Sequence, residues 1–182
     1  MVISLVTQKT IFKIRFYRPE DIDQVQRLNR VFLPEHYPPY FFDENFRRFP
    51  KAFIVAEGPS GILVGYVMCR VERGFTRGGM FNMGHILSIA VDKGFRRMGI
   101  GTSLMLEAEK NLVNEYRADL IYLEVRVSNE PAINLYKKLG YDFLGVMPSY
   151  YHDGEDGYLM YKITSAKTSK SDVMALLGDR IE

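Results

Sequence analysis

The segment SIAVDKGFRRMGIGT at positions 88–102 places an apolar strand, a short basic turn and two glycines directly before a predicted helix. The start of a helix exposes backbone N–H groups without intrahelical acceptors, and the helix dipole makes this end partly positive. Gly99 and Gly101 have no side chains that would keep an anion away from those donors. Arg96 and Arg97 add positive charge beside them. The segment therefore predicts a binding site for a phosphate group.

Two common phosphate-binding motifs do not match this turn. The dinucleotide fingerprint GxGxxG fails because Leu104 occupies the third glycine position, and the P-loop fails because no Gly-Lys-Ser/Thr follows. What remains is an R-x-x-G-x-G turn that joins a strand to a helix. A pair of glycines that only forms a tight turn is the alternative, but the flanking strand and helix favour a binding role.

The composition favours one domain with a substantial core. The chain has 182 residues, of which 47% are hydrophobic and 13% aromatic, enough to fill a single core. Acidic and basic residues nearly balance at a net charge of +2, which argues against a dedicated nucleic-acid-binding protein. The single cysteine, Cys69, excludes an intrachain disulfide and a cysteine-based zinc site, and its apolar neighbours predict a buried side chain.

The sequence predicts neither a targeting segment nor a membrane span. Positions 1–14, MVISLVTQKTIFKI, lack a basic segment before the apolar residues and a long apolar stretch, so no signal peptide is expected. No apolar run approaches the length of a membrane span. A single cysteine also fits a reducing compartment. We therefore expect a cytoplasmic protein that does not bind membranes.

The spacing of apolar residues predicts a mixed α/β (α+β) fold. Strands are expected at 12–17, 52–57, 62–71, 81–91, 120–127, 143–147 and 157–163, with turns at 58–61 and 74–79. Helices are expected at 19–32, 42–49, 99–116 and 128–140, and a loop rich in proline and tyrosine at 33–40. This order favours a mixed central sheet of about seven strands flanked by four helices. The predicted domain spans 12–163, with 1–11 and 164–182 as peripheral extensions.

Two polar residues near the start of the 128–140 helix are candidates for the site. Asn129 and Tyr136 lie seven residues apart, which is about two helical turns, so they share one face. The asparagine amide can bond to an extended ligand, and the tyrosine hydroxyl can donate a proton. The structural alternative is that Asn129 caps the helix and Tyr136 packs in the core.

Longer segments carry a family resemblance. The R-x-x-G-x-G turn, LEVRVSN at 123–129 and AINLYKKLGY at 132–141 resemble the GNAT superfamily of N-acetyltransferases. LPEHY at 33–37, GHI at 84–86 and YYHDGEDGY at 150–158 look like the N-terminal, α-amino acetyltransferases. They are most similar to archaeal relatives of the NatA catalytic subunit, which also resemble bacterial RimI. The resemblance covers about 12–163 and implies the GNAT fold.

The resemblance implies a set of roles for residues of this chain. It implies acetyl-CoA as cosubstrate, without a metal, held by Ile89, Ala90, Val91, Arg96, Arg97, Met98, Gly99, Ile100, Gly101, Thr102 and Asn129. It implies Tyr136 as general acid, and His85 and Glu124 as holders of a water that carries the amine proton. It implies that Leu33, Glu35, Tyr37, Tyr150 and Tyr151 surround the substrate N-terminus.

The residues alone leave simpler alternatives open. A lone histidine such as His85, between apolar residues of a strand, is often structural, and Glu124 can face solvent. Tyr150 and Tyr151 can be an ordinary aromatic pair of a hairpin, and Glu35 can be solvated. The size and aromatic content of the 33–40 loop nevertheless suit a lid over a substrate groove.

The expected reaction is direct acetyl transfer to the α-amine of a protein or nascent-peptide N-terminus. Cys69 is a poor nucleophile candidate because it lies in a core strand. Transfer to a small amine and a non-catalytic acyl-CoA sensor are the alternatives, although the 33–40 loop has no acidic cluster that would favour a polyamine. No specific nucleic acid is expected as a partner. Association with the ribosome, the oligomeric state and the preferred first residue stay open.

Overall fold

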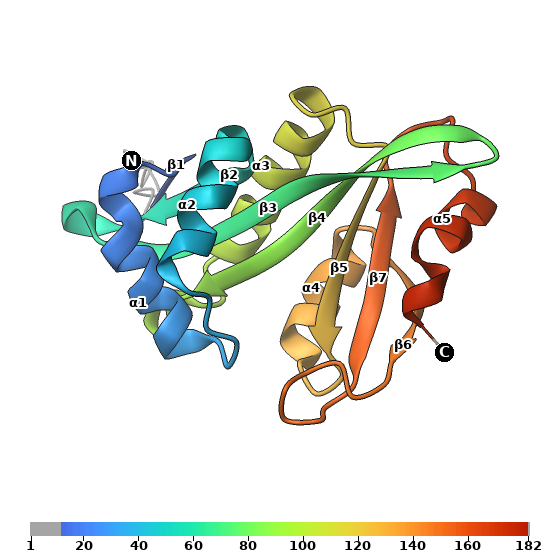
Figure 1. Ribbon diagram of the computed structural model, residues 1–182. Helices are drawn as coiled ribbons and strands as arrows, with labels where there is room; N and C mark the ends of the chain where they lie inside the picture. The colour runs from blue at the N-terminus through green and yellow to red at the C-terminus, as the bar shows by residue number, and fades with distance from the viewer. Residues whose placement is uncertain (1–11, 182) are drawn as a thin grey trace, which may run out of the picture.

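The computed structural model describes residues 12–181, so the predicted extension at 1–11 lies outside the described residues. One seven-stranded sheet has the order β1-β2-β3-β4-β5-β7-β6 (Figure 1). Its strands are β1 Lys13–Phe16, β2 Phe53–Glu57, β3 Leu63–Thr76, β4 Gly79–Val91, β5 Leu120–Arg126, β6 Asp142–Met147 and β7 Gly157–Ile163. The α-helices are α1 Ile22–Phe32, α2 Pro39–Arg48, α3 Ile100–Asn114, α4 Glu130–Lys138 and α5 Lys170–Leu177. The predicted mixed sheet of seven strands is confirmed.

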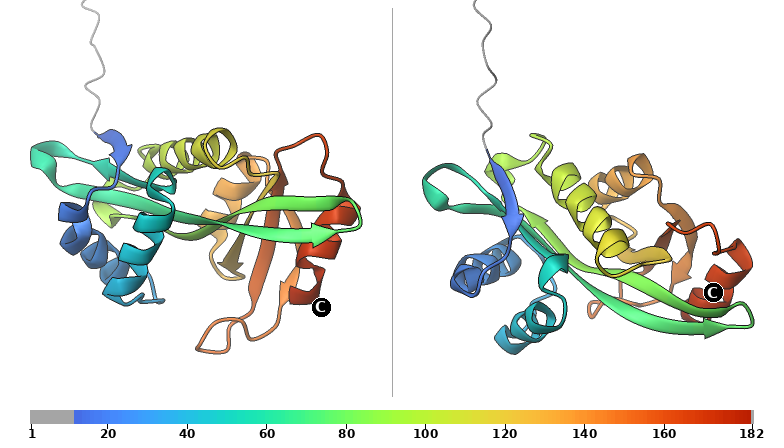
Figure 2. Two further views of the ribbon diagram at one scale, coloured as in Figure 1. Left: turned by 45° about the horizontal axis from the view of Figure 1, so that its top comes forward. Right: turned by 90° about the horizontal axis from the view of Figure 1, so that it is seen from above.

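Helices cover both faces of the sheet. Figure 2 shows α1 and α2 on one face and α3 and α4 on the other. Strand β3 explains this arrangement, because Tyr66 and Met68 are buried under α1 and α2 while Val67 and Cys69 are buried on the α3 face. A strand buried on both faces carries consecutive apolar residues rather than an alternating pattern. The prediction that Cys69 is buried is confirmed.

Strands β4 and β5 separate from each other halfway along β4. They pair in parallel only where Met83–Ile86 lie beside Leu120–Leu123. A bulge follows, with Leu87 as the extra residue between Ile86 and Ser88, and a bulge bends the strand that contains it. Figure 1 shows the two strands diverging beyond this point. The β5-facing edge of the last third of β4 therefore has no partner strand.

The hairpin between β3 and β4 is longer than predicted. Its turn was expected at 74–79, but the strands stay paired to Thr76 and Gly79. Gly74 serves close packing rather than a turn, because a Cβ at this position would collide with Leu176 of α5. The Thr76 hydroxyl also donates to Asp172 of α5 at 2.9 Å, so the extended hairpin is supported by the end of the chain.

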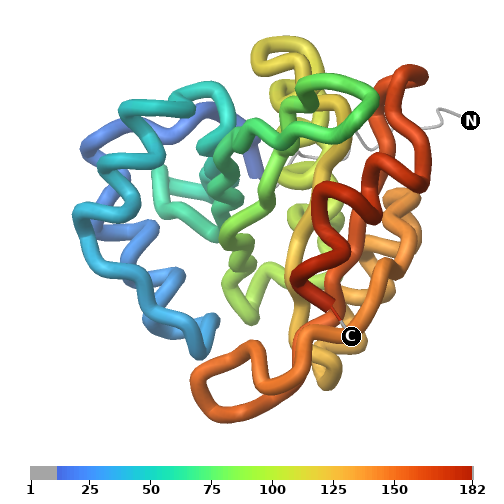
Figure 3. Tube along the Cα trace, turned by 45° about the vertical axis from the view of Figure 1, so that its right-hand side comes forward, coloured from blue at the N-terminus to red at the C-terminus, as the bar shows by residue number. Residues whose placement is uncertain are grey.

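The expectation that the carboxyl-terminal extension is peripheral is wrong. Helix α5 begins with a capping box, in which Ser169 accepts from the Asp172 N–H at 3.2 Å and Asp172 accepts from the Ser169 N–H at 3.0 Å. Val173 and Leu177 are fully buried beside Tyr122 of β5, and Figure 3 shows the tail lying along β6 and β7. The described residues thus hold five α-helices, where four were predicted. The domain limits at 12 and 163 stay predictions.

Candidate active site

The segment predicted to bind an anion forms a sharply turned helix start. After a short 3-10 helix at Lys93–Phe95, the backbone enters the left-handed region at Arg97, with φ of 65°, and at Gly99, with φ of 81°. The first helical bond runs from the Ser103 N–H to the Gly99 carbonyl at 2.9 Å. The N–H groups of Ile100, Gly101 and Thr102 therefore have no intrahelical acceptor, as an anion site requires.

The two glycines of this turn have different roles. Gly99 needs its left-handed backbone, which costs an L-residue with a side chain about 1–2 kcal/mol. No atom lies within 4 Å of the place where a Gly99 Cβ would stand, whereas a Gly101 Cβ would lie 3.4 Å from Leu135 of α4. Gly101 thus packs toward α4, which differs from the expectation that both glycines only clear space for an anion.

The arginines and the methionine of this turn lie at the surface. Arg96 does not extend freely, because its Nε donates to the Val91 carbonyl at 3.1 Å and its guanidinium lies over the Phe32 ring at 5.7 Å. Arg97 and Met98 are exposed, so their side chains can move toward a ligand. Arg96 therefore fastens the turn to the end of β4 while it adds positive charge there.

A cavity of about 700 Å³ opens between the diverging ends of β4 and β5. Among the predicted site residues, it is lined by Leu33, Glu35, Tyr37, His85, Ile89, Glu124, Asn129, Tyr136, Tyr150 and Tyr151. Ala90, Val91 and the turn residues from Arg96 to Thr102 do not line it and follow Ile89 along the chain. A second hollow of about 830 Å³ lies beside Arg48 and Tyr116 and holds none of the predicted residues.

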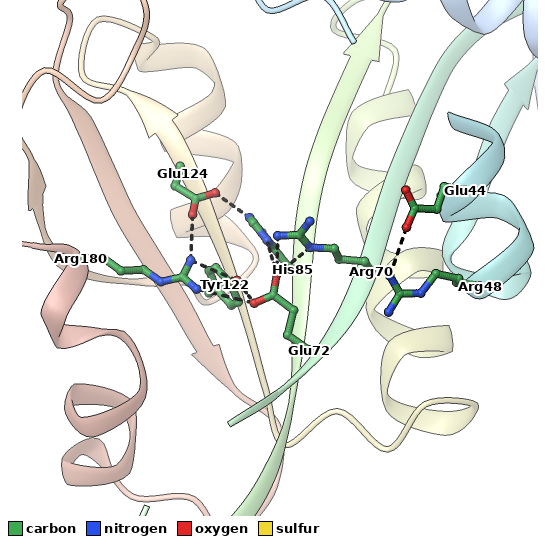
Figure 4. Close-up of polar contacts among 8 residues, drawn as sticks. All are labelled: Glu44, Arg48, Arg70, Glu72, His85, Tyr122, Glu124 and Arg180. Carbon is green, nitrogen blue, oxygen red and sulfur yellow. Dashed lines mark hydrogen bonds and ion pairs between the residues drawn. The ribbon is translucent and has the colours of Figure 1, made fainter. Parts of the chain in front are cut away.

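His85 lies between two carboxylates rather than alone in a strand. Its Nε2 is 2.7 Å from Glu124 Oε2, and its Nδ1 is 3.3 Å from Glu72 Oε1 (Figure 4). The His85 and Glu124 side chains are each only 8% exposed, so Glu124 does not face solvent. The ring of Tyr122 stacks on His85 at 4.2 Å, and the Tyr122 hydroxyl donates to Glu72 at 2.8 Å. The predicted pair is thus in direct contact, without an intervening group.

The contacts between His85 and the two carboxylates shift the pKa values of His85 and Glu72. Burial disfavours the charged imidazolium of His85, but its hydrogen bonds to Glu124 and Glu72 outweigh burial and raise its pKa. The bond from His85, together with Tyr122 and Arg70, holds the pKa of Glu72 well below its usual range. Groups with shifted pKa values are common at proton-transfer sites, so the electrostatics favour the same role as the geometry.

Asn129 and Tyr136 lie on the opposite wall, on α4. The Asn129 side chain accepts from the Ala132 N–H at 3.3 Å and caps α4, so the capping role is confirmed and the Nδ2 group stays available. Tyr136 is only 5% exposed but lines the cavity, and within 12–181 its hydroxyl has no hydrogen-bond partner. Burial raises the pKa of Tyr136, which keeps the hydroxyl protonated.

Arg126 joins the two loops that flank the cavity, and the sequence analysis missed it. Its guanidinium forms ion pairs with Glu35 of the 33–38 loop and with Asp153 and Glu155 of the β6–β7 loop. It also lies 4.2 Å from the ring centre of Tyr151. Glu35 is therefore only partly exposed and is paired with Arg126 rather than free in solvent. The available signal was a second charged residue, after Glu124, at the end of a largely apolar strand.

A buried hydrogen-bond network holds the first of these loops. Asn29 of α1 donates to the Tyr66 hydroxyl at 3.1 Å and accepts from the Tyr37 N–H at 3.2 Å. The Tyr66 hydroxyl is 2.6 Å from Ser88 Oγ, and the Tyr37 hydroxyl donates to the Leu87 carbonyl at 3.1 Å. Leaving one such buried group unpaired would cost about 1–3 kcal/mol. The signal for this network was an asparagine on the apolar face of α1.

The part of the chain that the structure describes contains neither a cluster of metal ligands nor a membrane-spanning helix. No group of three or more histidine, cysteine, aspartate or glutamate side chains is arranged to hold a metal ion in residues 12–181. No helix between these limits is both long and apolar enough to cross a membrane.

Comparisons with known proteins agree with this architecture. The acetyltransferase (GNAT) family matches residues 22–141. An N-alpha-acetyltransferase of Sulfurisphaera tokodaii is 49% identical over 153 residues, which cover 82% of this chain and 91% of that protein. The crystal structure of Ard1 from Thermoplasma volcanium has a TM-score of 0.74 and 33% identity, covering 85% of this chain and 98% of that one. Naa20 of Chaetomium thermophilum, solved in complex with a bisubstrate analogue, has a TM-score of 0.75 and 30% identity, covering 93% of this chain and 92% of that one. This chain belongs to the GNAT family of acetyltransferases.

Proposed function

We propose that this protein transfers the acetyl group of acetyl-CoA to the free α-amine of a protein or peptide N-terminus. The observation that carries the proposal is one cavity that brings the bare edge of β4 and Tyr136 together with the His85–Glu124 pair. The names of relatives support the reaction, since the S. tokodaii protein is an N-alpha-acetyltransferase and the Naa20 structure holds a bisubstrate analogue.

The residues at the separated strands fit acetyl-CoA. The N–H groups of Ile100, Gly101 and Thr102 at the start of α3 suit a pyrophosphate. Along the free edge of β4 from Ile89 through Ala90 to Val91, the backbone groups that point away from β3 can pair with an extended chain with amides, as in the addition of a strand to a sheet. The Val91 carbonyl at this edge accepts from Arg96 Nε. Asn129 Nδ2 supplies one further donor on the facing helix. When bound, acetyl-CoA supplies the acetyl group as a reactive thioester.

The titratable residues fit the removal of a proton from an α-amine. Glu124 bonds His85 through Oε2, which leaves Oε1 to accept the amine proton directly or through one water. An α-amine has a pKa near 8 and lysine one near 10.4, so deprotonation at neutral pH costs about 3.3 kcal/mol less for the α-amine. Tyr136, kept protonated by burial, donates a proton on the leaving-group side.

The charge around the groove favours a peptide over a polyamine. Glu35, Asp153 and Glu155 are the acids of the two flanking loops that pair with Arg126. Because one cation holds all three, they do not form the free acidic pocket that a polycation requires. Tyr37, Tyr150 and Tyr151 present hydroxyl and aromatic groups that can contact a peptide backbone whatever its side chains are.

Mass spectrometry of products from a set of substrates tests the proposal. The set contains peptides with different first residues, the same peptides with a blocked N-terminus and an internal lysine, and spermidine. We expect acetylation of free α-amines only. Faster acetylation of lysine or spermidine than of any α-amine would contradict the proposed substrate, and acetyl-CoA binding without turnover would indicate a sensor.

Several finer predictions accompany this proposal. Residence in the cytoplasm, action on nascent chains at the ribosome, the similarity to RimI and the absence of a metal or nucleic-acid partner stay predictions. The preferred first residue and the oligomeric state stay open, and the same peptide set would determine the first of these.

A further inference from the structure

The last described residues of the chain reach the proton-transfer group. A 3-10 turn at Gly178–Arg180 follows α5 and carries Arg180 toward β5. The Arg180 Nη1 donates to the Tyr122 hydroxyl at 3.2 Å, and the guanidinium carbon lies 5.0 Å from the Tyr122 ring centre. Figure 4 shows Arg180 approaching from the side opposite Arg70, with His85 and both carboxylates between them.

Arg180 lies near both carboxylates that flank His85. Its Nη1 is 3.6 Å from Glu124 Oε1, and its Nη2 is 3.6 Å from Glu72 Oε2. Among the described residues, only His85 and Arg180 make ion pairs with both glutamates. The oxygen of Glu124 near Arg180 is the one that does not bond His85, and it is therefore the oxygen available for the amine proton.

The contacts of the tail separate this electrostatic role from a packing role. Val173 and Leu177 are fully buried and anchor α5, while the Arg180 side chain is 35% exposed. The hydrophobic anchor thus does not need the guanidinium. A cation at this place favours ionised carboxylates and disfavours the charged imidazolium of His85.

We infer that Arg180 is a positioning residue for acetyl transfer: it fixes Glu72 and Glu124 around His85 and so holds in place the Glu124 oxygen that accepts the amine proton. This inference rests on the proposed function. It gives the carboxyl-terminal segment a part in the chemistry, because the packing of α5 against the sheet then also orders the Glu72–His85–Glu124 group.

All charged and titratable groups around the base enter the expected pH dependence. They are Glu72 and Arg70 from β3, Tyr122 and Glu124 from β5, Arg180 from the tail, and Tyr37, Tyr150 and Tyr151 from the two loops. Arg70 pairs with Glu72 but not with Glu124, so it does not replace Arg180 at the free oxygen. Loss of the Arg180 charge must therefore make His85, which lies between the two glutamates, easier to protonate, so the pKa of His85 must rise.

The test compares Arg180→Gln, Arg180→Met and Arg180→Lys with the wild type in peptide acetylation from pH 6 to 9. We expect the acid limb of kcat to move up by about half to one pH unit in the two neutral variants, because the site is partly exposed. Near the limb kcat then falls about 3- to 10-fold, while KM for acetyl-CoA stays constant. Arg180→Lys recovers most of the loss. Lys170→Gln, which removes a charge from the exposed start of α5, is the matched control and keeps the wild-type profile.

A second readout does not depend on turnover. The imidazole signals of His85, assigned from their loss in His85→Gln, are titrated by NMR in the free protein. A higher midpoint in Arg180→Gln, restored in Arg180→Lys, supports the inference even if the wild type acetylates no peptide, which would contradict only the proposed function. An unchanged midpoint and an unchanged kcat profile would overturn the inference, as would equal losses in Gln and Lys variants with lower melting temperatures.

Discussion

The two walls of the cavity are built from different parts of the chain. The wall proposed for acetyl-CoA consists of backbone groups at the end of β4, and the same continuous segment leads out of the cavity to the start of α3. The wall proposed for the amine consists of side chains, since His85 and Glu124 line the cavity from two strands and Glu72 of a third strand contacts His85. Backbone geometry can be encoded in a short motif, whereas a cluster of side chains depends on the whole fold. The predictions below test this contrast.

The largest effect is expected where the amine wall is removed. Replacing both His85 and Glu124 by glutamine keeps the volume but deletes the groups that move the proton. We expect kcat to fall about 10³-fold, within the range for proton-transfer groups, with acetyl-CoA affinity nearly unchanged. Steady-state kinetics and calorimetry measure the two quantities. If the double variant lost both equally, the two walls would not be independent.

Tyr136 lines the same cavity from α4, and its hydroxyl tests which of the two walls it serves. Tyr136→Phe keeps the buried ring and removes only an oxygen that has no partner within the described residues. We expect kcat to fall about 10²-fold, because the general acid is lost, while folding and acetyl-CoA binding persist. Tyr141→Phe on the same buried cluster is the control, since that hydroxyl is also unpartnered but does not line the cavity. Wild-type turnover of Tyr136→Phe would assign the hydroxyl no chemical role.

The contrast between local backbone motifs and clusters of distant side chains explains which features the sequence predicted and which it missed. The succession of strands and helices along the chain, the sharp turn before α3 and the α4 cap follow from local signals, such as glycines beside a helix start and Asn129 before Pro131. The contacts of Arg126 and Arg180 were missed because each joins segments far apart in the chain, including residues 35 and 126, and 72 and 180. The tail was misjudged because α5 has only eight residues, although the Ser169–Asp172 capping box was readable.

The backbone wall is tested at its two glycines. Gly99→Ala forces a side chain onto a left-handed residue, which costs about 1–2 kcal/mol, so we expect acetyl-CoA to bind about tenfold more weakly. Gly101→Ala is the matched control, because its Cβ would meet Leu135 only at van der Waals distance, and we expect a change within about twofold. Calorimetry with acetyl-CoA gives both values. Equal losses in the two variants would mean that the space beside the anion, and not the backbone angle, limits binding.

The smallest effect is expected at Arg126, which shapes the amine wall without taking part in proton transfer. Arg126→Gln leaves Glu35, Asp153 and Glu155 without their shared cation, so the two loops repel each other and the groove becomes acidic. We expect KM for peptides to rise about fivefold, kcat and acetyl-CoA affinity to change little, and spermidine to become a better substrate than it is for the wild type. Because these ion pairs are partly exposed, high salt should reduce the difference between variant and wild type in peptide KM.

Glu35→Gln distinguishes a direct contact between Glu35 and the peptide from an effect on the position of the loops. It removes one acid but leaves Arg126 paired with Asp153 and Glu155. If Glu35→Gln changes which first residues are preferred and Arg126→Gln lowers affinity for all peptides alike, then Glu35 contacts the substrate while Arg126 holds the loops. Identical changes in both variants would instead mean that the ion pair acts as a single unit.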